Sequence, residues 1–161
     1  NQIDEYQPDK PNHQTKYTLQ IGSKRIYNCL LELGFTPNKS LTLRFPAIPD
    51  SKLAHFVRGY LDGDGNIMAG LVRRKNRRKP GSILYLRLTS GSRDFLDQLR
   101  HQLNKVFKIG VGSLMKRSEN HYVLQYGARA TRQLYQFMYP STTVPHLSRK
   151  RELIELGLTD K

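Results

Sequence analysis

Two closely spaced aspartates at a predicted helix end are the strongest chemical signal in the chain. The segment Val57–Gly65 reads Val-Arg-Gly-Tyr-Leu-Asp-Gly-Asp-Gly and places Asp62 and Asp64 at the carboxyl end of a helix. The helix dipole is negative there and the last carbonyls lack partners, so two acids are electrostatically unfavourable. A bound cation removes this conflict, and carboxylate and carbonyl oxygens suit a hard divalent ion such as Mg²⁺. The segment therefore indicates a cation at this helix end.

Other interpretations of the two acids were compared with the sequence. An EF-hand loop starting at Asp62 needs Gly at its sixth position and Glu at its twelfth, but Ile67 and Arg73 stand there. A dinucleotide-binding loop follows a strand, whereas this glycine-rich turn follows a helix. A simple Asp-Gly turn at a helix end stays open, above all for Asp62, whose carboxylate can cap backbone groups instead of binding a metal.

The helix that carries the acids has a clear apolar pattern. Asp50 or Ser51 is placed to cap it, and Gly63 and Gly65 to end it. Apolar side chains recur with helical spacing at Leu53, Phe56, Val57, Tyr60 and Leu61. This stripe predicts that one face packs on a core.

The chain after residue 50 alternates helices with pairs of strands. Strands are predicted over 66–74 and 83–89, a helix from Ser92, strands over 111–117 and 121–126, and helices over 130–139 and 149–156. The order is α-β-β-α-β-β-α. We expect an α+β fold in which an antiparallel sheet has its helices on one side.

The first part of the chain resembles the end of the second part. Residues 1–16 are polar and contain two prolines, so a flexible lead-in is expected. A strand follows over 17–21, then a helix capped by Ser23, ended by Gly34 and followed by a loop. The hexapeptide at 17–22, Tyr-Thr-Leu-Gln-Ile-Gly, matches Tyr-Val-Leu-Gln-Tyr-Gly at 122–127 in four of six positions. Residues 17–49 are thus interpreted as a partial first repeat, and residues 50–161 as a complete domain.

Composition points to a nucleic-acid partner. The 161 residues carry 27 Lys and Arg against 13 Asp and Glu, a net charge of +14, with 37% hydrophobic residues, enough for a folded core. Cations that neutralise phosphates release counterions, which favours binding to nucleic acid. A ribosomal-type structural protein and a membrane-surface binder are the alternatives. The single Cys29 excludes an internal disulfide, and no apolar run has the length of a membrane span, so a protein acting inside the cell is expected.

A surface for DNA is predicted on the strands. Leu84, Leu86 and Leu88 share one face of their strand, so Tyr85 and Arg87 face the other way, where Arg is able to read guanine in the major groove. The second hairpin extends this surface with Lys116, Arg117 and His121. The loop between the first two strands holds six cations in seven residues, which suits contact with phosphates: Arg73, Arg74, Lys75, Arg77, Arg78 and Lys79.

The acidic segment resembles the motif that names the LAGLIDADG homing endonucleases. Gly59, Asp62, Asp64 and Gly65 match its letters, whereas Arg58 departs from a small residue. The similarity continues through residues 86–90 and 95–96 to Leu-Ser-Arg-Lys-Arg at 147–151. It resembles the half of a two-motif family member that contains the second motif, or a family member with a single motif.

The resemblance implies roles for particular residues. In such enzymes two motif helices pack side by side, which assigns helix packing to Gly59, Asp62 and Gly63. Asp64 is the implied metal ligand, assisted by the carbonyl of Gly65. A lysine stands near each metal centre, and Lys150 and Lys39 match it. Ser90 stands where relatives often have a polar residue near the metals, but a helix-capping role is the simpler interpretation.

The implied function is site-specific, Mg²⁺-dependent hydrolysis of phosphodiester bonds in double-stranded DNA, with catalysis by Asp64, Lys150 and Lys39. Only one acidic motif is present, while the family chemistry needs two acids. A missing N-terminal half or the partner in a homodimer is the expected source of the second. The alternative is a non-cleaving DNA- or RNA-binding protein on the same scaffold, such as a regulator or an intron-splicing maturase.

Overall fold

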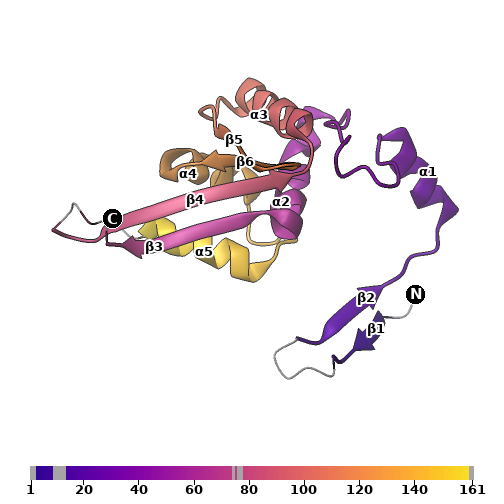
Figure 1. Ribbon diagram of the computed structural model, residues 1–161, viewed down its shortest axis with the longest axis horizontal. Coiled ribbons are helices and arrows are strands. Elements are labelled where there is room, and N and C mark those ends of the chain that lie inside the picture. The colour runs from indigo at the N-terminus through magenta and orange to yellow at the C-terminus, as the bar shows by residue number, and fades with distance from the viewer. Residues whose placement is uncertain (1–2, 9–13, 74, 76–77, 160–161) are drawn as a thin grey trace. The chain divides into compact units, whose positions relative to one another are not determined.

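The computed structural model describes residues 3–8, 14–73, 75 and 78–159 (Figure 1). The chain divides into two compact units, residues 1–36 and residues 37–161. Each unit is described by itself. None of the helices in the described residues is long and apolar enough to cross a membrane.

The larger unit has the predicted α+β order. After a 3₁₀ turn at Asp50–Lys52, its elements follow the predicted sequence of helices and strand pairs: α2 (Leu53–Asp64), β3 (Asn66–Val72), β4 (Gly81–Ser90), α3 (Arg93–Phe107), β5 (Ser113–Ser118), β6 (His121–Tyr126), α4 (Ala128–Met138) and α5 (Ser148–Thr159). The fold class is confirmed. Every predicted strand and helix of this unit is present, with ends shifted by a few residues.

The two ends of α2 differ from the prediction. Asp50 and Ser51 do not cap it, because they form the 3₁₀ turn, and the N-cap Lys52 makes no side-chain capping bond. At the other end α2 runs through Gly63 and stops at Asp64. Gly65 is required there because a Cβ on it would lie 2.5 Å from Leu61 Cδ1 and 2.7 Å from the Leu61 carbonyl oxygen.

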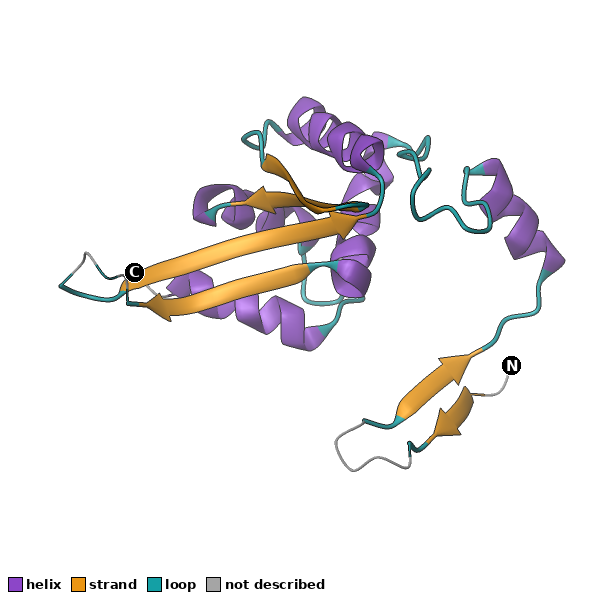
Figure 2. Ribbon diagram, in the orientation of Figure 1, coloured by secondary structure: helices purple, strands orange, loops and turns teal. Residues whose placement is uncertain are grey.

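The sheet of this unit is antiparallel, with strand order β3-β4-β6-β5. Side chains alternate along β4, and Leu84, Leu86 and Leu88 are buried under the helices while Tyr85 and Arg87 lie on the opposite face. Helices α4 and α5 lie behind the sheet in the view of Figure 2. In the described residues of this unit the face that carries Tyr85 and Arg87 is partly exposed, and we call it the uncovered face.

Residues 37–49 lie in the larger compact unit. The assignment of residues 17–49 to a partial first repeat stays a prediction. The segment 37–49 is tied to α3 by polar and aromatic contacts. The hydroxyl of Ser92 donates to the carbonyl of Leu43 at 2.6 Å, and Gln98 Oε1 accepts from the amide of Phe45 at 3.0 Å. The ring of Phe45 packs against those of Phe56 and Phe95, which also contact each other.

The smaller unit is a hairpin followed by a helix. Its elements are β1 (Ile3–Tyr6), β2 (Lys16–Leu19) and α1 (Lys24–Glu32). The side chain of Ser23 caps α1, as predicted, by accepting from the amide of Ile26. The strand β1 lies in the segment expected to be a flexible lead-in. It pairs antiparallel with β2, with Ile3 opposite Leu19, and this pairing is non-local, so polarity and prolines alone did not reveal it.

Candidate functional site

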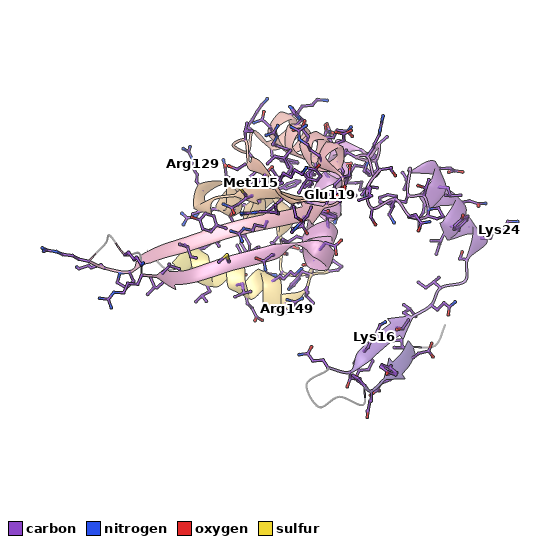
Figure 3. The ribbon with its side chains drawn as sticks, in the orientation of Figure 1. Lys16, Lys24, Met115, Glu119, Arg129 and Arg149 are labelled. Carbon is purple, nitrogen blue, oxygen red and sulfur yellow. The ribbon has the colours of Figure 1, made fainter. Side chains whose placement is uncertain are left out.

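The carboxyl end of α2 is closed by a buried lysine. The ammonium of Lys150, at the start of α5, donates to the carbonyl oxygens of Leu61 (2.5 Å), Asp62 (2.8 Å) and Gly65 (2.7 Å). The side chain is 4% exposed. Its neighbour Arg149 points away from the protein (Figure 3). Lys150 therefore supplies partners to the carbonyls that a helix end leaves unpaired.

This contact changes the electrostatic argument drawn from the sequence. The cation that balances the negative end of α2 is the Lys150 ammonium, so the two acids do not by themselves require a metal. Burial lowers the pKa of Lys150, and the charge of Arg149 adds to this, whereas Asp62 and Asp64 favour the charged form. The carbonyl of Gly65, the predicted second metal ligand, accepts from Lys150 and has one lone pair left.

Asp62 holds the loop that precedes α5. Its Oδ2 accepts from the amide of Leu147 at 3.1 Å. Its Oδ1 is buried and has no hydrogen-bond partner in the described part of the chain. Its carboxylate therefore caps a backbone amide at the start of α5, which agrees with the capping interpretation left open for Asp62, and the helix-packing role stays a prediction.

Asp64 lies at the protein surface beside the end of β4. Its side chain is exposed, and its carbonyl oxygen accepts from Thr89 Oγ1 at 3.1 Å, which fixes the end of α2 to the sheet. Asp64 lines a pocket of about 210 Å³, together with residues from the loop before α2 and from the end of β4. The lining residues are Lys39, Ser40, Leu43, Tyr60, Asp64, Thr89, Ser90 and Gly91. The structure thus brings together Asp64, Lys39 and Ser90, which the sequence singled out from three separate segments.

Tyr60 forms one wall of this pocket. Its hydroxyl donates to the carbonyl of Thr89. Burial raises the pKa of Tyr60 to about 12, a hydrogen bond with Ser90 opposes the shift and the charge of Asp64 adds to it. The phenol is therefore neutral at ordinary pH. Ser90 accepts from the amide of Ser92, and Ser92 rather than Ser90 is the N-cap of α3.

The side chains that could coordinate a metal ion are few at this site. In the residues that the structure describes, no group of three or more His, Cys, Asp or Glu side chains is placed to hold a metal. Asp64 offers one exposed carboxylate at the pocket, and hard divalent ions take several oxygen ligands. In the described residues, Asp64 alone therefore does not make a complete site for a divalent ion.

A polar row crosses the uncovered face of the sheet. Arg87 pairs with Asn66 on β3 and with Gln125 on β6, and Gln125 pairs in turn with Ser113 on β5. Arg87 Nε donates to Gln125 Oε1 at 2.7 Å, and its Cζ lies 6.0 Å from the centre of the Tyr85 ring. Sequence analysis found Tyr85 and Arg87 but missed Gln125, which strand register alone reveals.

The predicted basic residues are distributed unevenly. Arg73, Lys75, Arg78 and Lys79 are exposed in the loop after β3, while Arg74 and Arg77 lie outside the described residues. His121 and Arg117 are exposed on the second hairpin, Arg117 at an irregularity in the pairing. Lys116 pairs with Tyr122, on the same side as Leu124. Lys116 is exposed, and its contact with DNA stays a prediction.

The motif helix has one open face and one anchored face. A Cβ added to Gly59 or Gly63 would meet nothing within 4 Å, so this face leaves room for a second helix. On the other side Arg58, 4% exposed, donates to the carbonyls of Met138 (2.6 Å) and Pro145 (2.7 Å). The departure from the motif at Arg58 therefore anchors the end of α4 and the following loop, a role that sequence analysis missed.

Known proteins resemble this chain at both the family and the fold level. The model of a family described as "LAGLIDADG-like domain" matches residues 51–134, which is 84 of 161 residues. No curated protein sequence matches the chain.

The homing endonuclease I-CvuI, in complex with its target in the presence of calcium, has a similar fold. It aligns with a TM-score of 0.51 and 21% identity over 68% of this chain and 64% of its own.

The I-SmaMI LAGLIDADG homing endonuclease, bound to cleaved DNA, aligns with a TM-score of 0.52 and 16% identity, over 83% of this chain and 42% of its own. The chain thus spans less than two thirds of either protein. At these identities the likeness shows the fold alone. It agrees with the α-β-β-α-β-β-α order and the helices on one face of the sheet.

Proposed function

Because the chain belongs to the LAGLIDADG-like domain family, we propose that it is one half of a site-specific endonuclease that hydrolyses phosphodiester bonds of double-stranded DNA inside cells. The position of Asp64 is the main support. Its carboxylate is exposed at the edge of the uncovered sheet face, on a helix end held by Lys150 beneath it and by Thr89 beside it. A rigidly held acid next to a basic surface suits chemistry on a phosphate backbone.

In this proposal Asp64 would contribute its carboxylate to a Mg²⁺ ion, and the Gly65 carbonyl oxygen would contribute its remaining lone pair. A metal ion bound there supplies a water of lowered pKa and stabilises charge on the phosphate oxygens. Lys39, which lines the same pocket, is the lysine we assign to developing charge. Lys150 acts differently, because its ammonium is directed at backbone carbonyls and holds the end of α2 in place.

DNA would lie along the uncovered face of the sheet. Tyr85 and Arg87 stand at its centre, and the exposed cations of the loop after β3 extend beyond it. A two-stranded ribbon fits the major groove, while loop cations suit phosphates. The net charge of +14 supports a polyanionic partner of this kind.

The second carboxylate would come from a preceding repeat, not from a second copy of this chain. The hairpin β1–β2 and the helix α1 repeat the order of β5, β6 and α4, yet none of the nine α1 residues is buried. Within the described residues, β2 pairs with β1 alone, whereas β6 pairs with both β4 and β5. Unit 1 thus resembles the end of a repeat whose motif helix and first strands lie on another segment.

The test is metal-dependent cleavage of a plasmid library by the full 161-residue chain and by the same chain supplied with a preceding LAGLIDADG repeat. With Mg²⁺ the completed protein is expected to cut one site, and Asp64→Asn to abolish cutting. Affinity for duplex DNA should be unchanged or higher in Asp64→Asn, because an acid facing phosphates is removed. Asp97→Asn on α3, where Asp97 pairs with Arg100, is the matched control and should leave cutting intact.

Cutting that survives Asp64→Asn would overturn the assignment of the site. Tight duplex binding without cutting by any form of the protein would instead favour the alternative, a non-cleaving DNA-binding protein on this scaffold.

A further inference from the structure

We propose that Gln125 holds Arg87 in the orientation that reads one guanine, which makes this pair a determinant of the DNA sequence that the chain recognises. The inference rests on the proposed function, since it needs DNA on the uncovered face of the sheet. It goes further by assigning a base to a side chain and a positioning role to a second one.

The first support is the place of the pair in the sheet. Asn66, Arg87 and Gln125 are direct neighbours across β3, β4 and β6, and Ser113 on β5 completes the row. Every strand of the sheet thus contributes a polar side chain to one row of the uncovered face. Arg87 is the cation in this row, with a neighbour on each side.

The second support is which atoms of Arg87 are engaged. Its Nε donates to Gln125 Oε1 at 2.7 Å. In the described part of the chain no hydrogen bond uses Nη1 or Nη2, and the guanidinium lies 6.0 Å from the Tyr85 ring. The free edge therefore presents two parallel donors, and guanine is the base that offers two adjacent acceptors, O6 and N7, in the major groove.

The third support is how this bond engages Gln125. A glutamine reads adenine by using its amide oxygen and nitrogen together. Here the oxygen already accepts from Arg87, so one of its two lone pairs is engaged and the amide is directed at the guanidinium rather than at a base. A phosphate contact also explains the pair poorly, since a phosphate accepts from a guanidinium in many orientations. Exposed cations such as Arg73 and Lys79 already serve that purpose.

The experiment selects bound duplexes from a fully randomised library with the full 161-residue chain at low ionic strength. The wild-type protein is expected to enrich a motif with a guanine at one position. Arg87→Lys keeps the charge but loses the two-donor edge, and should lower the preference for that guanine by about five-fold to a hundred-fold. Overall duplex affinity should change little.

Two substitutions of Gln125 separate positioning from packing. Gln125→Leu keeps the size but removes the acceptor, so the preference at the same position should broaden while the rest of the motif is retained. Gln125→Glu keeps an acceptor for Nε, so the guanine preference should survive although the added negative charge weakens all duplexes alike. Gln136→Leu and Arg132→Lys, both exposed on α4, are the matched controls and should select the wild-type motif.

An unchanged guanine preference in Gln125→Leu or in Arg87→Lys would overturn the inference and leave the proposed function standing. Equal broadening in Gln125→Glu and Gln125→Leu would also overturn it, because the role of Gln125 would then be packing. A wild-type chain that binds no duplex would contradict the proposed function, and the inference with it.

Discussion

The two hairpin–helix regions of this chain have the same local order and opposite environments. β1, β2 and α1 repeat the order of β5, β6 and α4, and the matching hexapeptides at 17–22 and 122–127 lie at the same place in each. Leu124 is fully buried, yet its counterpart Leu19 is 54% exposed. The difference shows that local sequence forms the hairpin and the helix, whereas burial depends on the segment that packs on them.

The partners of the buried copy are visible in the larger unit. β6 is flanked by β4, and α4 packs against α2, α5 and the sheet. In unit 1, Ile26, Tyr27 and Leu30 of α1 and Leu33 at its C-cap remain 42–52% exposed. An amphipathic helix of this kind is stable when its apolar face is covered. The comparison therefore predicts which substitutions are costly and which are not.

The largest effect is expected for Leu124→Ala. Leu124 lies at the centre of the sheet, fully buried with Leu86 and Leu88, so truncation leaves a cavity. The free energy of unfolding should fall by about 2–5 kcal/mol. Urea denaturation followed by circular dichroism measures it. A loss below about 1 kcal/mol would mean that this region is packed as loosely as unit 1.

The lysines after the two helices extend the comparison. Lys150 follows α4 and donates to backbone carbonyls of α2, and Lys39 follows α1 in a surface loop. Lys150→Met leaves those carbonyls without partners and should cost about 2–4 kcal/mol of unfolding free energy, whereas Lys39→Met should cost less. The same denaturation experiment compares the two. An equal cost would contradict the capping role of Lys150.

A smaller effect is expected at high pH. Burial raises the pKa of Tyr60 and of Tyr139 to about 12 in the folded protein, and raises that of Tyr126 as well. Since the unfolded value is about 10, the neutral phenols stabilise the fold fully below pH 10, and this contribution is lost as the pH rises through 12.

Unfolding free energy should therefore fall by about 1–2 kcal/mol between about pH 9 and about pH 11, a range reduced because Tyr60 is partly exposed to solvent. Tyr60→Phe, which removes one titrating group, should reduce the fall. Urea denaturation at the two pH values measures it. The pKa of Lys150 is lowered in the folded protein, so its contribution to the unfolding free energy rises with pH until the pH passes its ordinary pKa. A net rise in unfolding free energy between the two pH values would show that Lys150 outweighs the tyrosines.

Sequence was sufficient for the parts of the fold that local patterns encode. The apolar stripe of α2, the cap Ser23 and the alternation of Leu84, Leu86 and Leu88 led to the correct order of elements, whereas the capping role expected of Ser90 belongs to Ser92. The strand β1 was missed, because its partner β2 lies ten residues or more along the chain and no turn motif marks the pair.

The candidate site was predicted in its residues but not in its contacts. Asp64, Lys39 and Ser90 line one pocket, and their roles in catalysis stay predictions. The cation at the end of α2 is Lys150, which lies 85 or more residues away in sequence, so the sequence argument assigned that charge to a metal. Gln125 was not singled out because its importance comes from strand register, and register is set by pairing across the sheet.

The smallest effect is expected for Leu19→Ala in unit 1. The side chain is 54% exposed, so little apolar surface is lost and the free energy of unfolding should change by less than about 0.5 kcal/mol. Supplied with a preceding repeat, the same substitution should cost about as much as Leu124→Ala, because β2 would then lie inside a sheet as β6 does. Urea denaturation of both forms makes this measurement. If Leu19→Ala is costly in the chain alone and the cost grows with protein concentration, a second copy covers unit 1. The missing carboxylate would then come from a homodimer.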